Sequence, residues 1–396
     1  MKTVIRLLSA AGFVVTALVR VTDPLLPAIA QDFGTAVADT AIIITTYALA
    51  YGLFQLLYGP LGDRVGKLKV IGGALAFTAI GTTACAFAKG IVPLAILRFA
   101  TGMTSAAVIP LSLAFFGDQV SYDKRQVTIG RYIGSLMMGQ IFGASLSGVL
   151  AEYVSWRVVF ILIGAAALII AIPIHIAARR FPSPSTEEAG RTSLFDFSGY
   201  LHLLSCRPVF FLMSAVFTEG IFSYGGFAFL GAELRSHWEL SFLAIGGILS
   251  SFGFGGIAYS MCVSWFVRRL GERRMLAVGS TAVALCYIIF SYIPSWKIVF
   301  VFLFMIGFAF YMFHNTYQTL ATELTPDKRG VTLSLFSFSL YLGQGIGVTL
   351  LGRIVAHAGY HVMFPLSGLG VLALGLWSQA RLGDMKNPET AGGATL

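Results

Sequence analysis

The sequence has few charged residues. Only 11% of its 396 residues are Asp, Glu, Lys or Arg, whereas a soluble domain carries about 25%. So few charges do not cover a water-facing surface, and 57% of the residues are hydrophobic. The solvent for most of the chain is therefore lipid, which excludes a soluble enzyme or a soluble binding module.

Patterns for metals, disulfides and nucleotides are also missing. The four cysteines have no metal-ligand spacing and imply no disulfide framework. Glycines in residues 253–258 and 343–345 resemble nucleotide loops only superficially, because neither group follows a strand in a soluble unit. No set of nucleophilic, metal-binding or acid–base residues converges in the sequence. We expect no enzyme activity, no metal and no cofactor.

The long apolar runs predict membrane-spanning helices. They lack the two-residue alternation of a membrane β-barrel. A span needs ~20 residues, so twelve spans with short loops use about 33 residues each, which this length just supplies. We predict an all-α membrane protein with twelve transmembrane helices. The expected spans are residues 7–30, 40–61, 68–88, 92–117, 126–151, 158–178, 208–230, 241–266, 275–293, 296–320, 330–355 and 360–379.

The basic residues give an orientation. The net charge is +9, yet no single domain holds the basic residues, so no nucleic-acid partner is expected. Twenty of the 27 fall at one set of helix ends, which includes both termini. The opposite ends hold only Lys89, Arg157, Arg235 and Lys297. The side rich in Lys and Arg is cytoplasmic, so both termini are expected in the cytoplasm.

The two halves of the chain repeat each other at an offset of 204 residues. Three matches carry this offset: Asp123-Lys124-Arg125 with Asp327-Lys328-Arg329, Gly139-Gln140 and Gly143 with Gly343-Gln344 and Gly347, and Phe160 with Phe364. Three matches at one offset predict a duplication. We expect pseudo-symmetric six-helix bundles at residues 1–178 and 208–396, joined by a cytoplasmic linker at 179–207. Parallel repeats of six helices imply a cavity between the bundles near the membrane midplane.

Three motifs resemble those of the major facilitator superfamily. The loop after the second span reads Gly59-Pro60-Leu61-Gly62-Asp63-Arg64-Val65-Gly66-Lys67-Leu68-Lys69, which is similar to the signature loop of that superfamily. Leu97-Arg98-Phe99 with Gly102 is similar to its second motif. Gly139, Gly143 and Gly148 are similar to the antiporter motif of its drug-efflux branch, although Ala144 stands where a proline is usual.

The resemblance covers the whole chain, and the arrangement is similar to that of bacterial twelve-helix drug:proton antiporters, also called sugar/drug efflux permeases. It implies the major facilitator fold, a bacterial inner (cytoplasmic) membrane, a small-molecule substrate, protons and the lipid bilayer as partners, and a monomer. Proton-coupled efflux by alternating access is the expected function. Uptake or facilitated diffusion of a metabolite such as a sugar is the alternative. A non-transporting sensor or a membrane-embedded enzyme is more remote.

The signature loop suggests a cytoplasmic gate. Gly62 and Gly66 permit a tight turn, and Asp63 is suited to the N-terminus of a neighbouring helix. Arg64 is expected to pair with Asp118 at the end of the fourth span. By resemblance, the gate that closes in the outward-facing state consists of Gly59, Gly62, Asp63, Arg64, Gly66, Lys67 and Asp118. The alternative is that these are ordinary charges of a cytoplasmic loop. Residues 268–274 occupy the matching place in the second half but lack the aspartate, so one strong latch is expected.

Ionisable residues inside a span cost ~2.5–3.5 kcal/mol on insertion scales and are functional candidates. Arg20 and Asp23 are three residues apart on one helix face, and Pro24 predicts a kink beyond them. Arg98 on the antiparallel fourth span falls in the same outer half of the membrane, so the sequence permits a contact with Asp23. Either Asp23 alternates between pairing with arginine and being protonated, or Arg20 and Asp23 form a permanent structural ion pair.

The second half offers its own candidates. Glu219 lies near the middle of the seventh span and is either a second proton or cation site or a carboxyl hydrogen-bonded to a neighbouring helix. His314 and Gln318 share a face of the tenth span, next to Asn315. They contact substrate or protons, or they hold helices together. The aromatic residues Phe222, Tyr224, Phe227 and Phe229 either line a cavity for a hydrophobic or cationic substrate or face lipid.

Overall fold

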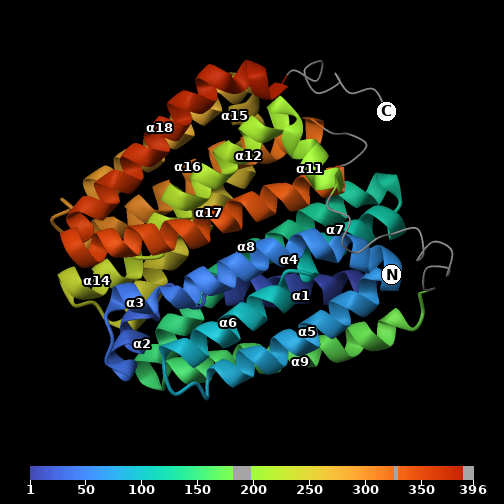
Figure 1. The fold of residues 1–396 in the computed structure, drawn as a ribbon, viewed down its shortest axis with the longest axis horizontal. Helices are drawn as coiled ribbons and strands as arrows, with labels where there is room; N and C mark the ends of the chain where they lie inside the picture. Colours follow the sequence, from blue (N-terminus) through green and yellow to red (C-terminus); the bar gives the residue numbers. More distant parts are fainter. Residues whose placement is uncertain (182–197, 325–328, 387–396) are drawn as a thin grey trace. The chain divides into compact units, whose positions relative to one another are not determined.

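The computed structural model describes residues 1–181, 198–324 and 329–386, and the part it describes is helical, without a strand (Figure 1). The first half consists of α1 (Lys2–Arg20), α2 (Leu26–Phe33), α3 (Val37–Thr40), α4 (Ile42–Val65), α5 (Lys67–Cys85), α6 (Ile91–Ser105), α7 (Val108–Gln119), α8 (Tyr122–Tyr153) and α9 (Trp156–Ala178). Three of the predicted spans each correspond to two consecutive helices, namely α1 with α2, α3 with α4, and α6 with α7. This half therefore has six crossings, as predicted.

The second half begins with α11 (Ser198–Ser205), a short helix inside the predicted linker. The seventh crossing is made of α12 (Arg207–Glu219), the π-helix η1 (Gly220–Tyr224), α13 (Gly225–Phe227) and α14 (Leu230–Trp238). The remaining helices are α15 (Phe242–Phe290), α16 (Trp296–Leu324), α17 (Arg329–Ala358) and α18 (Tyr360–Lys386). The rest of the linker, residues 182–197, and Asp327-Lys328 of the repeat lie outside the described residues.

The number of crossings depends on α15. Eleven helical segments among the described residues are long and apolar enough to cross a membrane, and Phe242–Phe290 is counted as one of them. Its 49 residues correspond to roughly 74 Å of helix, more than twice the ~30 Å hydrocarbon core. The backbone leaves the helical region at Gly271, with φ 66° and ψ 169°. The segment therefore crosses twice, and the described chain has the predicted twelve transmembrane helices.

The chain forms two compact units. One contains Met1–Asp196 with Glu239–Ser250, and the other contains Phe197–Trp238 with Ser251–Leu396. In the first unit α5 packs along α9 and α1 along α8 (Figure 1). In the second unit α17 packs along α12 and η1. The start of α15 belongs to the first unit because Gly246 packs against the backbone of α8 at Ala144 and Gly148.

Large apolar side chains cover the outer faces of these helices. Phe77 of α5, Ile96 of α6 and Ile169 of α9 are each between 64% and 69% exposed in the protein alone. In a membrane, lipid covers such side chains, so their exposure costs nothing there. The charged residues Arg20, Asp23, Arg98 and Glu219 have the opposite placement, since each is buried inside its own unit.

Candidate functional site

The first span breaks where the prolines predict a kink. α1 ends at Arg20, and the chain forms a turn over residues 21–25 before α2 begins at Leu26. The break brings Nη1 of Arg20 to 3.4 Å from Oδ2 of Asp23, and both side chains are at most 5% exposed. Nε of Arg20 also donates to Oε1 of Gln140 on α8, at 3.3 Å. The predicted Arg20–Asp23 pair is confirmed, and Gln140, which the sequence marked only as part of the repeat, belongs to the same site.

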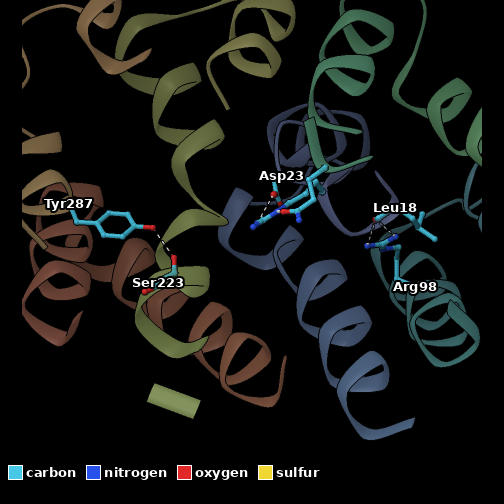
Figure 2. Close-up of polar contacts among 7 residues, drawn as sticks. Leu18, Asp23, Arg98, Ser223 and Tyr287 are labelled. Atoms are coloured by element: carbon cyan, nitrogen blue, oxygen red, sulfur yellow. Dashed lines mark hydrogen bonds and ion pairs between the residues drawn. The ribbon is translucent and has the colours of Figure 1, made fainter. Parts of the chain in front are cut away.

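Arg98 is buried on α6 but does not form an ion pair with Asp23. Its Nη1 and Nη2 donate to the carbonyl of Leu18 at 3.4 Å (Figure 2). Its Nε donates to the carbonyl of Ile43 at 3.4 Å. The guanidinium also lies 4.0 Å from the ring centroid of Tyr47. Arg98 therefore interacts with Asp23 through longer-range electrostatics and not through an ion pair. Since α1 ends at Arg20, the carbonyl of Leu18 belongs to its last turn and requires a donor, which Arg98 supplies.

The predicted gate residues come together around Lys67. Its Nζ lies 2.9 Å from Oδ1 of Asp63 and 2.7 Å from Oδ2 of Asp118, so one ammonium joins the end of α4 to the end of α7. The expected Arg64–Asp118 pair is wrong, because Arg64 is exposed and Lys67 is the partner of Asp118. Asp63 does not cap α5, whose N-cap is Gly66 without a side-chain hydrogen bond.

The glycines of this loop have separate roles. Gly66 has a φ of 105°, which favours glycine, and it joins α4 to α5 in a single residue. A Cβ on Gly62 would collide with the side chain of Leu111 on α7. Gly59 has nothing within 4 Å of its Cβ position, so packing does not explain it. In the second half, Gly271 has a φ of 66° at the place that matches Gly66.

The antiporter-like glycines of α8 are close-contact residues. A Cβ on Gly139 would meet the carbonyl of Phe13, and a Cβ on Gly143 would meet that of Ala17. Gly148 lies against Phe242 and Gly246 at the start of α15. The first two contacts let α8 approach the backbone of α1, and this approach positions Gln140 next to Arg20.

The same contacts recur in the second unit. A Cβ on Gly343 would meet the carbonyl of Phe217, and a Cβ on Gly347 would meet that of Ile221. Phe217 and Ile221 follow Phe13 and Ala17 by 204 residues, the offset of the sequence repeat. The packing frame of the first and fifth helices is thus repeated in the seventh and eleventh.

The charges are not repeated on this frame. Tyr224 and Phe227 stand at the positions equivalent to Arg20 and Asp23. A carboxyl of the second unit, that of Glu219, stands elsewhere on this frame; it is the last residue of α12 and is fully buried. Asp23 and Glu219 therefore occupy different positions of a common frame, and the second unit also buries the carboxylate of Glu233 on α14.

Glu219 pairs with His314. Nδ1 of His314 lies 2.8 Å from Oε1 of Glu219, and the exposed fractions of the two side chains are 11% and 0%. The other carboxylate oxygen, Oε2, is buried and has no hydrogen-bond partner among the described residues. The His314 ring stacks on Phe310 at 5.0 Å. The sequence identified both residues but did not predict that they meet.

The remaining predicted cavity residues fall into two groups. Tyr224 and Phe227 pack against Phe310 and Phe252, at 5.1 and 4.9 Å between ring centroids, and so belong to the aromatic cluster beside His314. Phe222 does not, because its ring packs against Gly370 of α18. Gln318 is exposed and Asn315 is partly exposed, so the structure brings neither into the Glu219–His314 pair. Phe229 is fully buried.

Comparisons with known proteins agree with this architecture. The family model described as Major Facilitator Superfamily matches residues 8–348 and 228–391. An uncharacterized MFS-type transporter of Bacillus subtilis, YceJ, is 26% identical over 83% of each chain. The multi-drug resistance efflux pump PmrA of Streptococcus pneumoniae is 26% identical over 91% of each chain.

A solved structure shares the fold. The crystal structure of a bacterial homologue of the human lysosomal transporter Spinster, in an inward-facing and unoccupied conformation, superposes with a TM-score of 0.78 at 17% identity and covers 98% of each chain. The family model extends over nearly the whole chain, and the fold and the repeated packing frame agree with it. The chain belongs to the Major Facilitator Superfamily and is a secondary transporter of small molecules.

Proposed function

We propose that the protein exports a small hydrophobic or cationic molecule by alternating access, driven by proton entry. The observation that carries this proposal is that each unit buries a carboxylate beside a basic side chain within a membrane span, Asp23 with Arg20 and Glu219 with His314. Ionisable groups inside membrane spans are expensive and are retained chiefly for ion or proton pathways.

Asp23 is suited to bind and release a proton. The neighbouring Arg20 favours the carboxylate, whereas burial favours the neutral acid. A group under two opposing influences changes its protonation when water access changes. In the proposed cycle, protonation of Asp23 or Glu219 shifts the balance between inward-open and outward-open states, and the Lys67 ion pairs hold one state closed.

The relatives and the aromatic residues support export of hydrophobic or cationic molecules. PmrA, similar over 91% of this chain, is a multidrug efflux pump. The cluster of Tyr224, Phe227 and Phe310 beside Glu219 offers apolar contact and a negative charge in one region of the second unit. A bacterial cytoplasmic membrane, cytoplasmic termini and a monomer belong to the same proposal.

Flux of ethidium, a hydrophobic cation, into and out of proteoliposomes tests this function. We expect wild-type protein to move ethidium in the direction opposite to the proton flow that an imposed pH gradient drives. Asp23→Asn or Glu219→Gln should abolish the part of the ethidium flux that depends on this gradient. Asp39→Asn and Glu323→Gln are matched controls, because both residues are exposed, and they should retain it. Coupled flux in Asp23→Asn would refute the role of Asp23. Movement that ignores the proton gradient would favour facilitated diffusion, and movement together with protons would favour uptake.

A further inference from the structure

The seventh crossing contains a π-helical turn directly after Glu219. η1 covers Gly220–Tyr224, and regular helix resumes at Gly225. A π-turn inserts one residue relative to an α-helix and is found frequently at functional sites. Because the extra residue rotates everything before it by about 100° relative to everything after it, the turn determines which way Glu219 points.

Packing on α17 explains why the turn forms. A Cβ on Gly220 would collide with the backbone of α17 at Leu340 and Gln344, and one on Gly225 would lie 3.0 Å from the carbonyl carbon of Gly347. Residues five apart on an α-helix are roughly 140° apart around the axis, so they do not face the same neighbour. Hydrogen bonding from i to i+5 places them one turn apart on one face.

The hydroxyl of Tyr287 on α15 makes a second contact with this turn. Tyr287 lies on the second crossing of α15 and donates a hydrogen bond of 2.7 Å to the carbonyl of Ser223, the fourth residue of η1 (Figure 2). The tyrosine is fully buried and its ring stacks on Phe364 at 6.1 Å. The hydroxyl of Ser223 itself has no hydrogen-bond partner among the described residues, so the contact depends on the backbone carbonyl.

We propose that Tyr287 is a positioning residue for Glu219. By satisfying a backbone carbonyl within the π-turn, it stabilises the register that brings Glu219 against His314. A buried carbonyl without this donor would favour return to α-helical bonding, which rotates Glu219 away from His314. Its importance for transport rests on the proposed function of Glu219, whereas its effect on the Glu219–His314 pair does not.

The test uses full-length protein labelled with ¹⁵N-histidine in detergent micelles. His314→Gln identifies the His314 ring signals by their loss. Tyr287→Phe keeps the ring and removes the hydroxyl, and we expect it to move the His314 Nδ1 signal toward that of free imidazole. Hydrogen exchange over residues 217–229 should become about two- to tenfold faster, the effect of losing one hydrogen bond.

Two variants serve as controls. Tyr58→Phe removes a comparable hydrogen bond of 2.9 Å, to the carbonyl of Met103 in the first unit, and Ser223→Ala removes only the unpartnered hydroxyl. Both should leave the His314 signal and the exchange of 217–229 unchanged. If Tyr287→Phe does not fold, Gly225→Ala is the second variant. It places a methyl group between the end of the same turn and Gly347 of α17, and it should move the same His314 signal.

An unchanged His314 signal in Tyr287→Phe would overturn the inference, and so would a Ser223→Ala variant that reproduces the effect. Neither measurement involves transport. Loss of flux with an unchanged signal therefore counts against Tyr287 alone, and a moved signal with normal coupled flux counts against the proposed role of Glu219.

Discussion

Lys67 and Asp118 are joined by an ion pair of 2.7 Å between Nζ and Oδ2, which links the first residue of α5 to the end of α7. The same ammonium contacts Asp63 at 2.9 Å, while Arg64 beside it is exposed. Lys67 thus forms the ion pair with Asp118 that the sequence predicted for Arg64, three residues earlier.

Replacing Lys67 should impair transport more than stability. Lys67→Gln breaks two ion pairs whose carboxylates are 57% and 52% exposed. Surface pairs contribute about 0–1 kcal/mol, so the melting temperature should change little. If the pairs hold one transport state, ethidium flux should fall about fivefold or more. Arg64→Gln is the matched control and should transport normally. Equal losses in the two variants would contradict a specific role for Lys67.

The Glu219–His314 pair should show strong energetic coupling. Glu219→Leu leaves a histidine nitrogen without its acceptor, and His314→Phe leaves both carboxylate oxygens buried without a donor. Each change should cost about 1–3 kcal/mol of unfolding free energy. The double variant should cost less than the sum by roughly 0.5–3 kcal/mol, because neither partner is left alone. The free energy of unfolding is measured in detergent for the wild type, the two single variants and the double variant. Strictly additive losses would mean that Glu219 and His314 do not interact.

Alanine at the repeated glycines should destabilise both units in the same way. Gly139→Ala places a methyl group against the Phe13 carbonyl, and Gly343→Ala places one against the Phe217 carbonyl. We expect about 1–3 kcal/mol for each, the cost of overpacking. Gly134→Ala in α8 has open space around its Cβ and should be neutral or slightly stabilising, since alanine favours a helix. A tolerated Gly139→Ala would show that α1 and α8 separate easily.

Much of the fold follows from local sequence. Trp296 and Tyr360 begin the tenth and twelfth predicted spans, and α16 and α18 begin at those residues. Apolar length and helix-breaking residues determine such ends, and both are visible in one chain. The break after Arg20 and the contact with Asp23 follow from Pro24 and a three-residue spacing for the same reason.

Contacts between helices were harder to predict. Arg98 interacts electrostatically with Asp23, but it donates hydrogen bonds to the Leu18 carbonyl, because the end of a broken helix exposes backbone acceptors that the sequence does not show. The π-turn after Glu219 was not predicted either. It arises from two glycines packing on one neighbouring helix, which requires knowing that α17 lies there.

The close contacts of Gly139 and Gly143 in the first unit are repeated by Gly343 and Gly347 in the second. The second unit therefore has positions that match those of the polar site in the first. Gln344 already stands at the position of Gln140, and Tyr224 and Phe227 occupy those of Arg20 and Asp23. Two substitutions, Tyr224→Arg and Phe227→Asp, would place the same residue types at the matching sequence positions, in a crossing that has a π-turn instead of the break after Arg20. The two copies of one scaffold therefore carry different polar groups at matching sequence positions, so the twofold likeness of the backbone does not extend to the chemistry that it supports.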